Sequence, residues 1–101
     1  MKRFEVWKLA TGDQPEQLVL VLQSERIDQI RTIVVAPLRP STANLVIEKL
    51  TPQLSVQGTA YVALIPLMSA VDRRELIEKV DHAGQFDYEI MAALDRLFTG
   101  L

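Results

Sequence analysis

The sequence contains no cysteine and a single histidine, His82, among its 101 residues. The absence of cysteine excludes disulfide bonds, catalytic thiols and thiolate metal sites. One histidine also excludes a metal site built from several imidazoles. No stretch approaches the roughly 18 charge-free apolar residues of a membrane-spanning helix, and the start lacks the apolar run of a signal peptide. We therefore expect a small soluble cytoplasmic protein with no metal, cofactor or membrane partner.

Neither sign of charge dominates, because the chain has 11 Lys and Arg residues and 13 Asp and Glu residues, which gives a net charge of −2. A sequence pI near 5.3 argues against broad electrostatic binding of nucleic acid, whose protein surfaces are usually basic. The chain is 49% hydrophobic, which is typical of a globular protein. The length predicts a single domain over residues 1–101 that can bury a core without covalent crosslinks.

Short apolar runs bounded by turn-forming residues predict most of the secondary structure as strands. The expected strands cover residues 4–8, 18–22 and 32–36, followed by a hairpin of 54–57 and 61–67 around Gly58. Pro37 and Pro40 are expected to end the third strand, which should pair antiparallel with the second. Residues 45–50 fit a strand or a short helix equally well, and the choice stays open.

Two segments carry helix signals. Asp72 and Glu75 have the spacing of a capping box, which predicts one or two helical turns running to Asp81. Asp87 is expected to cap a terminal helix that ends near Gly100. Apolar residues on one face of that helix should pack on the core: Ile90, Leu94, Leu97 and Phe98. Several strands and a terminal helix predict a small barrel-like β domain with one packed helix.

The apolar arc of the terminal helix, from Phe86 to Phe98, is wide for a helix that lies on a single sheet. One interpretation is that one face meets the core and the rest is loosely exposed. We prefer the alternative, in which part of the arc forms a homodimer or partner surface.

No catalytic centre emerges from the motifs. His82 is the only histidine available as a base, and there is no Gly-x-Ser-x-Gly sequence to expose a serine nucleophile. We interpret His82 as a solvated loop residue before Ala83 and Gly84. The carboxylates Asp81, Asp87 and Glu89 fit favourable charges at a helix start better than an acid–base pair. The chain is therefore predicted to be a binding protein and not an enzyme.

Two other features are interpreted as structural. Arg73 and Arg74 form too short a basic run for a phosphate-binding patch, so we expect a solvated face. Trp7, on the first strand, is expected to lie in the core or in an interface.

Several segments, in order and spacing, resemble the CcdB family of toxins from type II toxin–antitoxin modules. They are Lys2–Trp7, Leu20–Asp28, Val35–Leu38, Leu50–Pro52, Met68–Val71, Tyr88–Leu94 and Leu97–Leu101. The resemblance implies a mainly β fold, an SH3-like barrel of the CcdB and MazF type closed by a C-terminal helix and assembled as a homodimer. It also implies a toxin, with a role in plasmid maintenance, that binds the DNA gyrase A subunit and traps the cleaved-DNA complex.

The resemblance further implies a CcdA-like antitoxin whose disordered segment folds onto the toxin. Gyrase contacts carried over from the family fall on two segments. The first is the chain end, with Asp95, Leu97, Phe98, Thr99, Gly100 and Leu101, and the second is the link after the second strand, with Ser24, Arg26 and Ile27. The link residues are expected to flank the chain end.

Two of these positions depart from the family. Gyrase-poisoning members end in Trp-Gly-Ile, whereas this chain ends in Thr99-Gly100-Leu101, and Arg26 occupies a position that is usually apolar. Because large aromatic anchors commonly dominate binding energy, we expect weakened gyrase poisoning. Two alternatives stay open: an mRNA endonuclease toxin on the same barrel, and a non-toxic homologue that only binds antitoxin.

Overall fold

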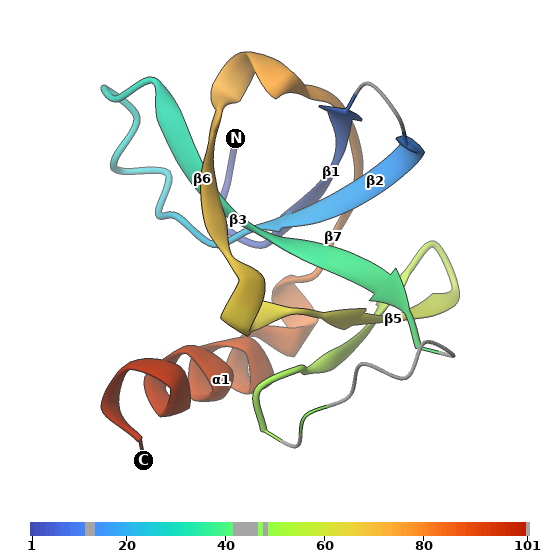
Figure 1. The fold of residues 1–101 in the computed structure, drawn as a ribbon, viewed down its shortest axis with the longest axis vertical. Helices are drawn as coiled ribbons and strands as arrows, with labels where there is room; N and C mark the ends of the chain where they lie inside the picture. The colour runs from blue at the N-terminus through green and yellow to red at the C-terminus, as the bar shows by residue number, and fades with distance from the viewer. Residues whose placement is uncertain (12–13, 42–46, 48, 101) are drawn as a thin grey trace.

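The computed structural model describes residues 1–11, 14–41, 47 and 49–100. Figure 1 shows a half-barrel of strands with one helix, α1, packed beside it. The elements are β1 (Glu5–Thr11), β2 (Gln14–Val21), β3 (Thr32–Pro40), β4 (Gln53–Val56), β5 (Thr59–Ala63), the 3₁₀ helix η1 (Ile65–Leu67), β6 (Ser69–Asp72), η2 (Arg73–Glu75), β7 (Leu76–His82), η3 (Gly84–Phe86) and α1 (Asp87–Thr99). The expected fold class, mainly β with a C-terminal helix, is confirmed.

The described strands form one antiparallel sheet in the order β4-β5-β3-β2-β1-β7, and β6 also pairs with β3. Three positions of β2 lie opposite three of β3: Val19 with Pro37, Leu20 with Ala36 and Val21 with Val35. This register confirms the predicted antiparallel pairing of the second and third apolar runs.

The third strand runs through Pro37 to Pro40, so the expectation that these prolines end it is wrong. Proline removes a backbone donor but keeps its carbonyl. The carbonyl of Pro37 accepts from the Leu64 N–H at 2.9 Å. On this edge β3 changes partner, from β6 at Thr32–Val35 to β5 at Leu38–Pro40. Pro37 therefore lies between the residues that pair with β6 and those that pair with β5, so neither pairing requires an N–H from Pro37.

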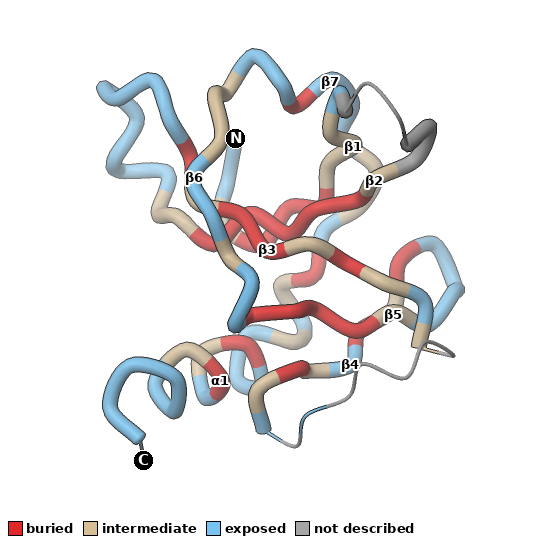
Figure 2. Tube along the Cα trace, viewed as in Figure 1, coloured by how far each residue is buried: buried red, intermediate tan, exposed pale blue. Residues whose placement is uncertain are grey.

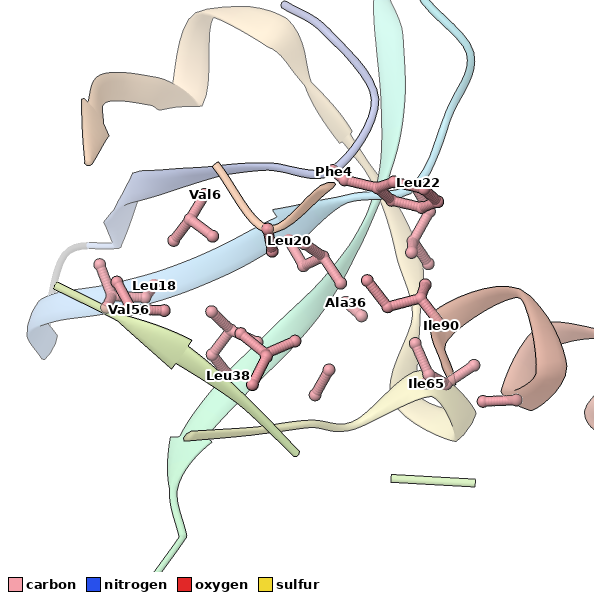
Figure 3. Packing of buried hydrophobic residues seen from close by; sticks show 14 residues of the cluster. Phe4, Val6, Leu18, Leu20, Leu22, Ala36, Leu38, Val56, Ile65 and Ile90 are labelled. Carbon is pink, nitrogen blue, oxygen red and sulfur yellow. The ribbon is translucent and has the colours of Figure 1, made fainter. Parts of the chain in front are cut away.

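Strand β2 is buried on both faces, as its uninterrupted apolar run predicts. Leu18 and Leu20 belong to the larger core cluster, whereas Val19 and Val21 belong to a second cluster on the other face. Figure 3 shows Ile90 of α1 within the larger cluster. In Figure 2 the buried residues run along the centre of β2 and β3. The predicted place of Trp7 is also confirmed, because it packs partly buried against the second cluster.

The predicted hairpin is present, and it draws the two ends of the sheet together. Its second strand ends at Ala63, however, and Ile65–Leu67 form η1 instead of the expected strand. Gln57 (φ +50°) and Gly58 (φ +82°) form the two-residue turn between β4 and β5, with the positive φ angles that such turns require. The Gln57 N–H donates to Asp81 Oδ2 at 2.7 Å, and Gln57 Nε2 donates to the Val80 carbonyl at 3.2 Å. These bonds join the hairpin to β7, the strand at the other end of the sheet order.

The segment after Asp72 corrects a prediction. Asp72 does cap a helical turn, accepting a hydrogen bond from the Arg74 N–H at 2.9 Å. The turn is the three-residue η2, however, and the chain then continues as β7 and not as a helix to Asp81. Strand β7 pairs with β1 through two register shifts. The open edge of β1, which is distant in sequence, therefore outweighs the local helix signal.

The start of α1 corrects a second prediction. Phe86 occupies the N-cap position without a side-chain cap, and Asp87 is already helical. The chain enters α1 through η3, so the Asp87 backbone lies inside helical structure and its side chain cannot act as the cap.

Residues 45, 46 and 48 of the segment left open between strand and helix lie outside the described residues. The described part of that segment contains a turn, in which the Ile47 carbonyl accepts from the N–H groups of Leu50 at 3.0 Å and Thr51 at 3.1 Å.

Candidate protein-binding surface at the end of α1

The first half of α1 anchors the helix, and its last turns are exposed. Ile90 and Ala93 are fully buried, and Met91 and Leu94 pack against the core with part of their surface exposed. Every residue from Asp95 to Gly100 is exposed. Figure 2 shows buried positions only in the first half of α1 and exposed ones throughout its last turns. The last turns therefore carry side chains that the core does not use.

The expected core stripe of α1 is only half correct. Ile90 and Leu94 pack as predicted, but Leu97 is 36% exposed and Phe98 is 71% exposed. Burying such a side chain contributes about 1.5–3 kcal/mol. Exposed apolar side chains of this kind are candidate contact points for a partner protein.

The end of α1 is fixed by its own hydrogen bonds. Gly100 adopts φ +75°, a conformation that favours glycine, and its N–H donates to the Arg96 carbonyl at 2.8 Å. The Thr99 hydroxyl donates to the Asp95 carbonyl one turn earlier. The structure thus brings together five predicted site residues: Asp95, Leu97, Phe98, Thr99 and Gly100. The sixth, Leu101, lies outside the described residues.

The other predicted contacts lie in residues 22–31, between β2 and β3, which we call the link. Ser24 forms a turn there, its carbonyl accepting from the Ile27 N–H at 3.1 Å and its hydroxyl oxygen from the Arg26 N–H at 3.2 Å. Arg26 and Ile27 are exposed. Figure 1 shows the link and the end of α1 well separated within one chain. Their membership of one binding surface stays a prediction.

Arg3 connects the link to α1, and nothing in the sequence pattern singled it out for this role. Its backbone N–H donates to Glu25 Oε2 at 3.3 Å, and its guanidinium contacts Met91 Sδ at 2.6 Å. The guanidinium also lies 4.8 Å from the centre of the Phe4 ring, a distance at which a cation is attracted to an aromatic face. Hydrogen bonds from the backbone of Glu25 itself and from Arg3 hold the pKa of the Glu25 carboxyl below its ordinary value.

A groove of about 360 Å³ lies along the outer side of α1. Its walls are formed by Lys49 and Pro52 on one side and by Tyr88, Glu89, Ala92 and Arg96 on the helix. The lining of the groove is mostly apolar, and its charged members are two cationic side chains, Lys49 and Arg96, and one carboxylate, Glu89. The groove was not predicted, because Lys49 and Arg96 are 47 positions apart in the sequence.

In a comparison with known protein families, residues 3–100 of this chain match the CcdB protein family. The chain belongs to the CcdB family. The resemblance drawn from its sequence segments is therefore confirmed. A search of curated proteins found no match.

Solved structures share the fold of this CcdB-family chain. An endoribonuclease in complex with its cognate antitoxin from a mycobacterial species has a TM-score of 0.76 and 18% identity, covering 100% of this chain and 96% of that one. The Mycobacterium tuberculosis toxin MazF-mt6 has a TM-score of 0.75 and 12% identity, covering 93% and 95%. An endoribonuclease from a mycobacterial species has a TM-score of 0.70 and 17% identity, covering 100% and 92%.

Family and fold together support a toxin of a toxin–antitoxin system. They also correct one prediction. The chain was expected not to be an enzyme, but solved structures with its fold are named endoribonucleases. The absence of a recognisable catalytic motif was a poor guide, because catalytic groups that meet only in the folded protein leave no local signature.

Two neighbouring groups with acid–base chemistry, Asp81 and His82, lie at the end of β7 in this CcdB-family chain. His82 is exposed at the end of β7, and its Nδ1 accepts from the Gly84 N–H at 3.0 Å. Asp81 does not lie at a helix start as expected; it accepts from the N–H groups of Gln57 and His82, which lower the pKa of its carboxyl. Within the described part of the chain, no group of three His, Asp or Glu residues is placed to hold a metal ion.

A buried carboxylate on β1 also escaped the sequence analysis. Glu5 Oε1 accepts from the Lys2 N–H at 2.9 Å and from Trp7 Nε1 at 3.0 Å, and Oε2 lies 3.1 Å from Lys79 Nζ. Burial alone raises the pKa of Glu5, but these three partners together outweigh it and hold the pKa below its ordinary value.

No helix among the described residues is long and apolar enough to cross a membrane.

Proposed function

We propose that this protein is the toxin of a toxin–antitoxin module and that it binds the A subunit of DNA gyrase through the exposed end of α1. The exposure of Phe98 carries the proposal, since the helix presents a large aromatic side chain that the core leaves uncovered. Aromatic residues of this kind commonly anchor protein interfaces. Thr99 supplies only a methyl and a hydroxyl beside this anchor, so we expect binding to be weak and trapping of cleaved DNA to be limited.

We further propose that the protein acts as a homodimer. Within one chain the link and the end of α1 lie apart (Figure 1), and a two-fold assembly would allow the link of one protomer to reach the helix end of its partner. Exposed apolar residues available for such an interface include Leu67 of η1 and Leu97 of α1. Sedimentation at micromolar concentration tests this point, and a mass near 11.4 kDa would refute it.

The proposed second partner is an antitoxin segment that is disordered until it binds. The groove beside α1 suits such a segment, because Lys49 and Arg96 can meet acidic residues, Glu89 can meet a basic one, and Pro52 and Ala92 can accept an apolar one. One fold neighbour was solved with its cognate antitoxin, which supports a partner of this kind.

Two matched substitutions on α1 test the gyrase proposal. Phe98 and Tyr88 are both exposed aromatic residues of the same helix, at opposite ends of it. We expect Phe98→Ala to weaken binding to the gyrase A subunit by about 30-fold, the loss typical of a modest interface anchor. Tyr88→Ala should leave this binding unchanged. Equal binding by both variants and the unmodified protein would refute the role of the helix end.

RNA cleavage is the second candidate function, and the named activity of the fold neighbours favours it. The cleavage of RNA requires a base for the attacking hydroxyl and an acid for the leaving oxygen. Induction of the protein in bacteria, followed by assays of gyrase supercoiling and of total RNA integrity, separates the candidates. Fragmented RNA with unaffected supercoiling would replace the gyrase proposal by this one. If the protein affects neither supercoiling nor RNA but still binds the antitoxin, it is a non-toxic homologue.

A further inference from the structure

Arg73 and Arg74 are neighbours in sequence but have different roles in the fold. Both were expected on a solvated face. This holds for Arg74, which is exposed and whose guanidinium pairs with the carboxylate of Asp72 at 3.2 Å. It is wrong for Arg73, which is only partly exposed and turns toward the link.

Three hydrogen bonds join Arg73 to the link. Its Nε donates to the Ile30 carbonyl at 2.8 Å, and its Nη2 donates to the Ile27 carbonyl at 2.8 Å. Its backbone N–H donates to the Arg31 carbonyl at 3.0 Å. The planar fork of one guanidinium thus spans two carbonyls three residues apart, a geometry that the single ammonium of lysine cannot reproduce.

All residues in the outer part of the link, from Glu25 to Arg31, are exposed, so polar contacts hold this part in place of a packed core. Apart from Arg73, these contacts include the turn at Ser24, the hydrogen bond from the Arg3 N–H to Glu25 and the ion pair of Arg31 with Asp72 at 3.7 Å. Besides Arg73, the Ile27 carbonyl accepts from Gln23 Nε2 at 2.9 Å. Held in this way, the link presents two apolar side chains to solvent, with Ile27 47% and Ile30 46% exposed.

We propose that Arg73 is a positioning residue that fixes the link in the conformation that presents Ile27 and Ile30 to the protein target. The inference rests on the proposed function for the identity of that target, the gyrase A subunit. A prearranged loop does not lose conformational entropy on binding. If the link adopts the competent conformation in about a tenth of molecules once Arg73 is replaced, the apparent Kd rises about ten-fold.

Amide hydrogen exchange of the intact protein tests the positioning role without gyrase. Arg73→Met removes the fork and retains much of the aliphatic length, and Arg74→Met is the matched control with the same change of charge. We expect Arg73→Met to accelerate exchange of the Arg26 and Ile27 amides at least ten-fold, with little change in the core strands. Arg74→Met should leave the link amides unchanged. Unchanged exchange in Arg73→Met, or equal acceleration in both variants, would overturn the proposal.

Binding to the gyrase A subunit then tests the consequence. We expect about ten-fold weaker binding by Arg73→Met, an intermediate loss for Arg73→Lys, and unaltered binding by Arg74→Met. Faster link exchange with unaltered gyrase binding would overturn the role in target recognition. If the unmodified protein shows no gyrase binding, the proposed function fails, and amide exchange still decides whether Arg73 positions the link. Thermal unfolding of each variant distinguishes a loosened link from a destabilised fold.

Discussion

Replacing Glu5 by glutamine tests how strongly one buried carboxylate stabilises the outer face of β1. Glu5 is 5% exposed, and its two oxygens meet Lys2, Trp7 and Lys79 at 2.9–3.1 Å. Glutamine can keep an acceptor for Lys2 and Trp7, but its amide would turn a donor toward the Lys79 ammonium. Hydrogen bonds to charged groups contribute roughly 1.5–3 kcal/mol, against 0.5–1.5 for neutral ones. Since Lys79 is half-exposed, we expect a loss of about 1–2 kcal/mol at pH 7.

The same substitution predicts a pH dependence. Burial raises the pKa of Glu5, but the combined effect of Lys2, Trp7 and Lys79 places it below the ordinary value of 4.5. A carboxyl with a lowered pKa contributes its full stability above its unfolded-state pKa and loses it as pH falls through the folded-state pKa. The difference in unfolding free energy between the unmodified protein and Glu5→Gln should therefore be largest at neutral pH. It should shrink as the pH falls below the unfolded-state pKa, and it should vanish only where the carboxyl is protonated in the folded state as well.

Urea unfolding followed by fluorescence measures this difference, since Trp7 is the only tryptophan in the chain. Glu78→Gln is the matched control: Glu78 pairs with Lys8 at 3.7 Å with most of its side chain exposed, and such pairs contribute about 0–1 kcal/mol. Other carboxylates with lowered pKa values are shared by both proteins and cancel in the comparison. An equal cost of Glu5→Gln at pH 7 and near about pH 3 would refute the electrostatic explanation.

Four further substitutions test the core, the barrel closure and the target. Ile90→Asp places a charge at a fully buried position and should cost several kcal/mol; circular dichroism with an unchanged thermal transition would contradict this. Asp81→Ala removes the acceptor for the Gln57 N–H and should lower the unfolding free energy by about 1 kcal/mol, which denaturant titration can detect or exclude. Thr99→Trp should strengthen gyrase A binding by roughly 30-fold, with a further gain from Arg26→Ile. Strong inhibition of supercoiling by the unmodified chain would show that Thr99 is already an adequate anchor.

The sequence predicts those parts of the fold in which local pattern and burial agree. The run from Leu18 to Leu22 can only be buried on both faces, and it forms the centre of the sheet. The turn at Gly58 needs a positive φ angle that glycine supplies. Strand β7 could not be found in this way, because its partner is the edge of β1, about 70 residues earlier.

Prediction of the candidate site was also limited by contacts between residues that are distant in the sequence. Family resemblance placed five residues on the end of α1, where the structure brings them together. Helical spacing, in contrast, could not show that Leu97 and Phe98 lie beyond the sheet, since that depends on where the helix crosses the core. The contact between Arg73 and Ile27 spans 46 positions and uses a backbone carbonyl. No pattern of side-chain types records such a contact.

The division of α1 into a half anchored in the core and an exposed half suggests how one fold could serve different targets. Ile90 and Ala93 belong to the core, and core positions accept other apolar residues when volume is preserved. The fold can therefore persist at the 12–18% identity that separates this chain from its structural neighbours. Phe98 and Thr99 are exposed, so we expect their replacement to alter recognition at little cost to stability. Threonine at position 99 is accordingly expected to change what the toxin binds without changing how it folds.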